Sequence, residues 1–187
     1  MSGFRHLGDT EVAQLHSMRI VQGHFEAPDG TAFDRDIVRN RGAVAMVPVL
    51  DDGRTVLLVR QYRGPIDSLL LEIPAGLCDV DDEEPEATAH RELAEEIGRA
   101  AGSLDALVRY HAAAGFSDHV VQIYLATDLT EGPDSRQGVE EAHMTIEELD
   151  LGGLDRAIDD GTLTDAKSII GLLRARDLLR VRGPGRS

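Results

Sequence analysis

The chain has very little of several residue types that mark particular classes of protein. It contains one cysteine, Cys78, no tryptophan, and only four phenylalanines and three tyrosines among 187 residues. A single cysteine excludes an intrachain disulfide and favours a reducing compartment, so we expect a cytoplasmic protein. We expect Cys78 itself to be a small, partly buried side chain rather than a catalytic thiol.

Long apolar runs and basic residues are also scarce. No stretch approaches the roughly 18 consecutive apolar residues that a membrane-spanning helix needs, so we expect no membrane association. Lysine and arginine together number 19 against 34 aspartates and glutamates, which gives a formal net charge of −15. Affinity for a phosphate backbone depends on basic side chains, and nucleic acid polymers are therefore not expected partners.

The apolar residues that are present suffice for one compact domain, because 42% of the chain is hydrophobic. Strand-like runs at 19–25 and 31–38 flank an Asp-Gly pair and predict a β-hairpin, and runs at 43–50 and 55–62 flank another and predict a second hairpin. Strands on both sides of a central helix indicate an α/β sandwich. Further strands are predicted at 106–110, 120–126 and 144–147, and further helices at 154–160 and 166–179.

These patterns divide the chain into three parts. Residues 1–40 form an N-terminal β-hairpin extension, residues 41–180 form the main domain, and residues 181–187 form a flexible tail. A two-stranded hairpin is too small to be stable alone, so the extension must pack on another surface.

Three glutamates in the middle of the chain carry the strongest chemical signal. Glu92, Glu95 and Glu96 are spaced by three and four residues, so they share one face of an α-helix. Like charges at that spacing repel one another, and a bound cation would relieve the repulsion. Carboxylate oxygens are hard ligands that select Mg²⁺ or Mn²⁺. The spacing thus indicates a divalent metal site, and the alternative is an acidic, solvated helix face.

The residues around these glutamates predict a helix. Pro85 suits its first turn, and either Gly98 or the Gly102-Ser103 pair ends it. Ala89, Leu93, Ile97 and Ala100 repeat at spacings of three and four and form an apolar stripe for the core. An apolar strand and a loop that opens at Gly76 precede the helix, and glycine lets the backbone approach a phosphate or a metal closely.

The segment from Gly76 to Gly98 resembles the signature of the Nudix hydrolases. That signature reads Gly, five residues, Glu, seven residues, then Arg-Glu-apolar-x-Glu-Glu-x-Gly and an apolar residue. Here Glu83, seven residues and Arg91-Glu92-Leu93-Ala94-Glu95-Glu96-Ile97-Gly98 fit the spacing. Six residues rather than five separate Gly76 from Glu83, and Arg99 stands at the closing apolar position. An extra loop residue leaves the helix register unchanged.

Other segments are similar to the ADP-ribose pyrophosphatase branch of that family. Arg60-Gln61-Tyr62-Arg63 and Leu71-Glu72-Ile73-Pro74-Ala75-Gly76 look like that branch's Arg-Gln-Tyr-Arg and Leu-Glu-x-Pro-Ala-Gly segments. The segments at 138–141 and 165–170 are similar too. One feature differs, because Ala113 and Ala114 stand where members of the branch commonly carry Ser-Pro.

The resemblance implies a Nudix-type α/β/α sandwich with a mixed sheet, preceded by a small N-terminal antiparallel β-hairpin region. It implies a homodimer in which the N-terminal strands are exchanged between subunits, and the alternative is that the hairpin packs on its own subunit. It also implies dependence on Mg²⁺, for which Mn²⁺ can substitute.

The resemblance further implies a metal-binding role for the helix and the loop before it. Glu92, Glu95 and Glu96 would hold the ion together with the backbone carbonyl of Ala75. Arg91 would orient the glutamates by pairing with them. We therefore expect the three glutamates and Arg91 to be catalytic.

Substrate contacts and the general base are expected elsewhere in the chain. Arg60 and Arg63 lie near the end of a strand, where they could pair with phosphate oxygens, and Glu72 could accept a ribose hydroxyl. The branch resemblance points to Glu140 or Glu141 as the base that deprotonates the attacking water. The alternative for these last two is a solvated acidic loop.

Three functions follow from these signals. The first is metal-dependent hydrolysis of the pyrophosphate bond of ADP-ribose, a nucleotide sugar, to AMP and ribose 5-phosphate. The second is the same chemistry on another nucleotide sugar such as GDP-mannose, which the missing Ser-Pro favours. The third is a non-catalytic Nudix-like module that senses a nucleotide. Such a module is expected to lose signature glutamates, and all three are present.

Overall fold

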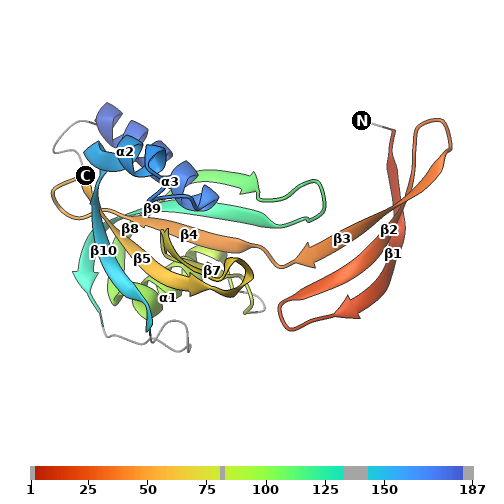
Figure 1. Ribbon diagram of the computed structural model, residues 1–187, viewed down its shortest axis with the longest axis horizontal. Helices are drawn as coiled ribbons and strands as arrows, with labels where there is room; N and C mark the ends of the chain where they lie inside the picture. Colours follow the sequence, from red (N-terminus) through yellow and green to blue (C-terminus); the bar gives the residue numbers. More distant parts are fainter. Residues whose placement is uncertain (1–2, 81–82, 133–142, 183–187) are drawn as a thin grey trace. The chain divides into compact units, whose positions relative to one another are not determined.

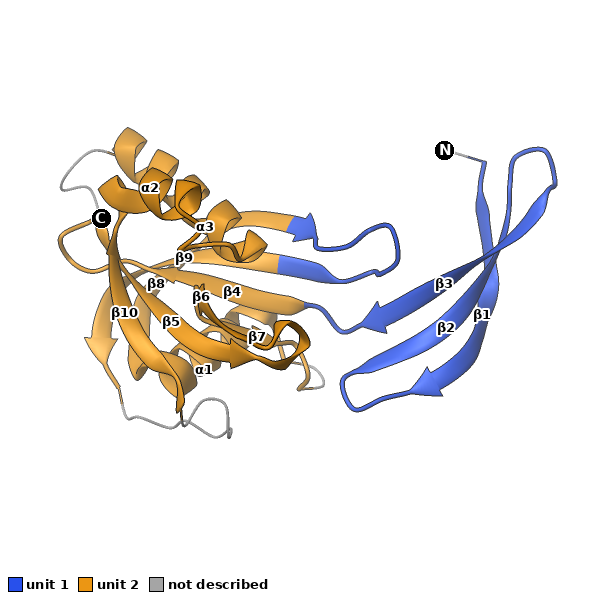
Figure 2. Cartoon of the chain, viewed as in Figure 1, with its two compact units in different colours: residues 1–42, 110–121 blue, residues 43–109, 122–187 orange. Residues whose placement is uncertain are grey.

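The computed structural model describes residues 3–80, 83–132 and 143–182. The chain divides into two compact units, coloured separately in Figure 2. The smaller unit contains residues 1–42 and 110–121, and the larger contains residues 43–109 and 122–187. The grouping of residues 110–121 with the N-terminal residues has no counterpart in the sequence prediction.

The N-terminal part of the smaller unit is a three-stranded antiparallel sheet in the order β1-β2-β3 (Figure 1). Its strands are β1 (Arg5–Gln14), β2 (Met18–Glu26) and β3 (Ala32–Asn40). The first predicted hairpin is confirmed as β2 and β3. The sequence did not indicate β1, because two shifts in its register with β2 interrupt the alternation that marks a strand.

The larger unit holds two further sheets, whose strand orders are β7-β4-β9-β8 and β10-β5-β6. Among the helices that the structure describes, none is both long and apolar enough to cross a membrane. The strands are β4 (Ala43–Pro48), β5 (Thr55–Arg63), β6 (Ser68–Glu72), β7 (Ala75–Leu77), β8 (Arg99–His111), β9 (Val120–Glu131) and β10 (Thr145–Asp150), and the helices are α1 (Pro85–Ile97), α2 (Leu154–Asp159) and α3 (Ala166–Arg182), with short 3₁₀ turns at Gly64–Ile66 and Leu151–Gly153.

Strand β4 lies between helices and is buried on both faces. Val44 and Met46 pack in the apolar core that includes Leu93 of α1. Val47 points to the opposite face, where its side chain lies against Gly171 of α3. Figure 1 shows α1 on one side of the sheets and α2 and α3 on the other. The predicted α/β/α sandwich is therefore confirmed.

The second predicted hairpin forms only at its turn, where the Leu50 N–H donates to the Thr55 carbonyl oxygen, and the predicted pairing of its two strands is wrong. Its two runs form β4 and β5, but β4 belongs to the sheet of β7 and β9, whereas β5 pairs with β6 and β10. Within the described residues, an isolated bridge between Val49 and Val56 is the one β-bridge that joins the two runs. Both strands are buried on both faces, so their apolar pattern does not specify the neighbour with which each pairs.

Helix α1 begins at Pro85, as the sequence indicated, and ends at Gly98, one of the two stops that the sequence allowed. Pro85 occupies the first turn, and Gly98 ends the helix in the left-handed conformation with φ of 62°. The backbone N–H of Gly98 donates to the carbonyl oxygens of Ala94 and Leu93. The other predicted helices form as α2 and α3, and α3 continues through Arg182, so the first two residues assigned to the tail are helical.

The start of α3 is tied to the end of β6 by buried polar contacts. The backbone N–H of Ile73 donates to Ser168 Oγ over 2.8 Å, and Ser168 Oγ donates to Asp165 Oδ2 over 2.5 Å. Ser168 has no exposed surface. Asp165 also accepts the backbone N–H of Ser168, which satisfies one donor of the first helical turn. These contacts position the chain that leads from β6 into the Pro74-Ala75-Gly76 segment.

Replacing Ser168 with alanine should lower the free energy of unfolding by about 1–3 kcal/mol, because the Ile73 N–H would lose its buried acceptor. Urea unfolding measures the change. Ser103→Ala, at a half-buried serine on β8 without a side-chain hydrogen bond among the described contacts, is the control and should change stability by less. Equal effects of the two substitutions would show that the hydrogen bond between Ile73 and Ser168 does not stabilise the fold.

Candidate active site

The carboxylates of α1 are partly withdrawn from solvent. Glu92 is 9% exposed and Glu96 is 5% exposed, while Glu95 is half-buried. Glu96 Oε2 accepts the backbone N–H of Ala75 over 2.9 Å. The helix therefore holds one carboxylate directly against the backbone at the start of β7.

Arg91 contacts two of these carboxylates, Glu92 and Glu95. Its Nη1 donates to Glu92 Oε1 over 2.6 Å and to Glu95 Oε2 over 3.1 Å. Its Nη2 lies 3.3 Å from Glu83 Oε2 and 3.6 Å from Asp79 Oδ1. One guanidinium thus faces four carboxylates.

The pKa values reflect this arrangement. Burial raises the pKa of Glu92 to about 7, the charge of Arg91 opposes that rise, and the charge of Glu95 adds to it. Burial also disfavours the charged form of Arg91, but its carboxylate neighbours outweigh burial and raise its pKa. A further cation at this cluster would favour the ionised form of Glu92.

Gly76 is the residue whose small size makes the cluster possible. A Cβ built at this position would lie 2.0 Å from Glu92 Cδ and 2.2 Å from Glu92 Oε1. Any side chain here would therefore displace the carboxylate of Glu92. Strand β7 and α1 are packed against each other at the position of the carboxylate cluster.

A second charged group lies at the end of β6. Glu72 is 1% exposed and forms a two-point pair with Arg63, with N–O distances of 2.6 and 2.7 Å. Lys167 of α3 contacts Glu72 and also lies 3.0 Å from Asp165 Oδ2. These cations outweigh burial and lower the pKa of Glu72. The charge of Glu96 contributes to the raised pKa of Arg63, so the two groups are electrostatically coupled.

The structure separates Arg60 from this second group. Residues 60 and 63 are an odd number apart on β5, so their side chains leave opposite faces of the strand. Arg60 forms a two-point pair with Glu147 of β10, with N–O distances of 2.5 and 3.1 Å. Glu140 and Glu141, the expected general bases, lie outside the described residues.

The cluster on α1 has the donor chemistry of a divalent metal site. Its donors are carboxylate oxygens, the kind of ligand that Mg²⁺ and Mn²⁺ prefer, and the backbone of β7 at Ala75 and Gly76 lies against two of them. As they stand, Glu92 and Glu95 are turned to Arg91, while Glu96 is turned to the Ala75 N–H. Over residues 3–80, 83–132 and 143–182, no three His, Cys, Asp or Glu side chains converge closely enough to hold an ion.

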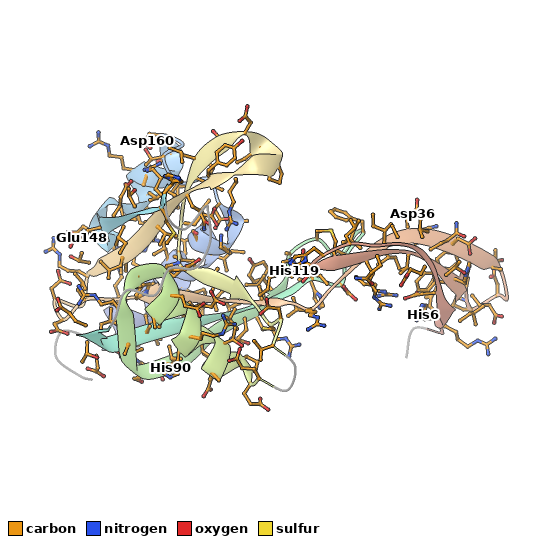
Figure 3. All side chains as sticks on the ribbon, turned by 90° about the horizontal axis from the view of Figure 1, so that it is seen from below. His6, Asp36, His90, His119, Glu148 and Asp160 are labelled. Carbon is orange, nitrogen blue, oxygen red and sulfur yellow. The ribbon has the colours of Figure 1, made fainter. Side chains whose placement is uncertain are left out.

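The histidines do not form another metal site within the described residues, because they belong to no group of three possible metal ligands. Among the side chains that Figure 3 labels, His6 comes from β1, His90 from α1 and His119 from the loop before β9. Burial lowers the pKa of His119.

A cavity of about 840 Å³ lies elsewhere on the larger unit and is distinct from the glutamate cluster. It is lined by the turn after β4, by the end of α3 including Arg176 and Arg180, and by parts of β8 and β9. No residue of the glutamate cluster lines it. This cavity therefore does not coincide with the candidate active site.

Sequence reasoning assigned no role to Lys167 or Glu147, although both pair with expected site residues. Lys167 lies two residues after Asp165 at the start of a predicted helix. This local pattern predicts the helix end, but it does not predict that Lys167 contacts Glu72. The pairing of Glu147 with Arg60 depends on the register of β10 against β5. Neither long-range contact leaves a local pattern in the sequence.

Comparison with known proteins agrees with this geometry. The family profile described as the NUDIX domain matches residues 39–165. The ADP-ribose pyrophosphatase of Bacillus subtilis (strain 168) is 36% identical over 143 residues, 76% of each chain. The ADP-ribose pyrophosphatase of Mycobacterium tuberculosis (strain H37Rv) is 40% identical over 146 residues, which cover 78% of this chain and 70% of that one.

A solved structure shows the same fold along nearly the whole chain. The crystal structure of an ADP compounds hydrolase superposes with a TM-score of 0.83 at 27% sequence identity, covering 97% of both chains. The expected signature, the α/β/α layers and the matched relatives all agree. This chain therefore belongs to the Nudix hydrolase family, in its ADP-ribose pyrophosphatase-like branch.

Proposed function

We propose that this protein hydrolyses the pyrophosphate bond of ADP-ribose to AMP and ribose 5-phosphate, in a reaction that requires Mg²⁺ or Mn²⁺. The observation that carries the proposal is the group of carboxylates on α1, with Glu92 and Glu96 buried against the Ala75-Gly76 backbone. The two ADP-ribose pyrophosphatases among the relatives support the choice of substrate.

Glu92, Glu95, Glu96 and the backbone carbonyl of Ala75 would hold the metal. Bound there, it would neutralise charge on the diphosphate and lower the pKa of an attacking water. Arg91 would restrain the glutamates through the contacts described above. The raised pKa of Glu92 links ion binding at this site to pH, because the carboxyl group must lose its proton to act as a ligand.

Substrate binding falls to the group at the end of β6. Arg63 would pair with phosphate oxygens, and Glu72, held ionised by Arg63 and Lys167, would accept a ribose hydroxyl. Arg60 would have to leave its pair with Glu147 to take part. Glu140 or Glu141 would deprotonate the attacking water.

We further propose a homodimer formed through the N-terminal sheet. Several large apolar residues of the smaller unit are more than half exposed, which is unusual unless another surface covers them. These exposed residues are Phe4, Leu7, Val12 and Phe116.

We also propose a cytoplasmic location, because a chain with a single cysteine fits a reducing compartment.

Product analysis on a panel of nucleotide sugars tests the substrate. We expect ADP-ribose to be cleaved with the highest kcat/KM in the presence of Mg²⁺, yielding AMP and ribose 5-phosphate. A preference for GDP-mannose would support the second function, which the replacement of Ser-Pro by Ala113 and Ala114 favours. Nucleotide binding without any cleavage would support the sensing module instead.

Replacing Glu96 with glutamine should lower kcat about 100-fold or more at saturating Mg²⁺, which corresponds to roughly 3 kcal/mol of transition-state stabilisation. The glutamine can still accept the Ala75 N–H, so folding should be retained. Steady-state kinetics measure the effect. Glu86→Gln, at an exposed glutamate on the same helix, is the matched control, and near-wild-type turnover in Glu96→Gln would contradict the metal role.

Replacing Gly76 with alanine should weaken Mn²⁺ binding and lower kcat by about tenfold or more, because the new Cβ would push the Glu92 carboxylate from its position. Electron paramagnetic resonance counts the free Mn²⁺. Gly153→Ala places a methyl group in open space and should leave both quantities unchanged. Normal Mn²⁺ affinity in Gly76→Ala would show that the contact with Glu92 is not needed.

The metal-free protein should lose stability as the pH rises from about 4.5 to about 7. The pKa of Glu92 is about 7 in the folded protein against an ordinary value of 4.5, so the folded state binds more protons within this window. Melting temperatures in EDTA at pH 5 and pH 7.5 measure the effect. Glu92→Gln should show a smaller fall than the wild type, and identical falls would contradict the assignment.

A further inference from the structure

Gln61 is a buried polar residue whose amide nitrogen has no protein partner. It lies in β5 and is 6% exposed. Within the described part of the chain, its Nε2 is buried and makes no hydrogen bond. A buried donor without a partner is rare in folded proteins, because it has given up its bonds to water without replacement. Such a donor therefore needs an explanation.

The neighbours of Gln61 place it beside the proposed substrate contacts. Gln61 and Arg63 are two residues apart on β5, so their side chains share one face of the strand. In the pairing with β6, Gln61 lies opposite Leu70 and Val59 lies opposite Glu72. The side chain of Gln61 is thus on the face that carries both Arg63 and Glu72, which form their ion pair there.

The same face leads to the glutamate cluster. Val59 and Leu57, the preceding residues on this face of β5, pack in the core with Leu93 of α1. Further along the strand, the charge of Glu96 raises the pKa of Arg63, so Arg63 lies within electrostatic range of the α1 carboxylates. Gln61 stands between the apolar core and Arg63 on this face, next to the place where the diphosphate is proposed to bind.

We propose that Gln61 is a substrate-binding residue whose amide Nε2 donates a hydrogen bond to an oxygen of the substrate, either on a phosphate or on the attached ribose. This inference rests on the proposed function and adds a residue to its binding site. The amide gives up stability in the free protein and gains its partner when substrate is present. The neighbouring cation, Arg63, favours an anionic oxygen as that partner.

The chain contains a natural control for this idea. Gln122 of β9 is also partly buried, but its Nε2 donates to the carbonyl oxygens of Val108 and Ile123 over 3.3 and 3.1 Å. Methionine has about the volume of glutamine and no amide. The same substitution at both positions therefore compares a donor without a protein partner with a donor that has two.

The experiment measures melting temperature without ligand and kcat/KM for ADP-ribose in wild type, Gln61→Met and Gln122→Met. We expect Gln61→Met to melt at or above the wild-type temperature while its kcat/KM falls about tenfold or more, chiefly through KM. Gln122→Met should melt at a lower temperature and keep its KM. Calorimetric titration of Gln61→Met with AMP and with ribose 5-phosphate should show weaker binding of at least one of them, which identifies the part of the substrate that is contacted.

A lower melting temperature for Gln61→Met, or an unchanged KM with unchanged binding of both products, would overturn the inference. The proposed function fails separately, if the wild type does not cleave ADP-ribose. In that case the melting comparison still decides whether Gln61 has a structural partner, and KM is compared on the nucleotide sugar that the wild type does cleave.

Discussion

Burial of like charges on one face of α1 is the constraint on which the site depends. Glu92 and Glu96 are almost fully buried, and four carboxylates lie around the single guanidinium of Arg91. Isolated buried charges are costly, so such a cluster persists when a further partner repays its desolvation. Gly76 makes room for Glu92, and the Ala75 N–H anchors Glu96, so the surrounding chain is shaped to keep the carboxylates in place.

The fold fixes that cluster from both sides of the sheet. On one side, the apolar stripe of α1 packs against β4, and this packing positions the helix that carries the carboxylates. On the other side, Ser168 at the start of α3 holds the Ile73 N–H. Two residues later, Ala75 meets Glu96. A short piece of backbone therefore connects the two helices through the sheet, and its position sets the geometry of the proposed metal ligands.

Local signals made much of this predictable, and long-range contacts made the rest unpredictable. Pro85 and Gly98 mark the ends of α1, and the spacing of its glutamates needs no tertiary information. The division of β4 and β5 into separate sheets could not be foreseen, because strands buried on both faces do not reveal their neighbours. The same holds for the contact of Gly76 with Glu92 and for the unpartnered amide of Gln61, which depend on how distant segments pack.

Calorimetric titration of the purified, folded protein with Mn²⁺, with and without ADP-ribose, tests the central claim most directly. The account predicts saturable Mn²⁺ binding that strengthens as the pH rises through the pKa of Glu92, near 7. It also predicts that Glu92→Gln and Glu96→Gln each weaken this binding about tenfold or more, since each substitution removes a charged ligand. Absence of Mn²⁺ uptake under both conditions, or equal uptake by the wild type and both variants, would contradict the account.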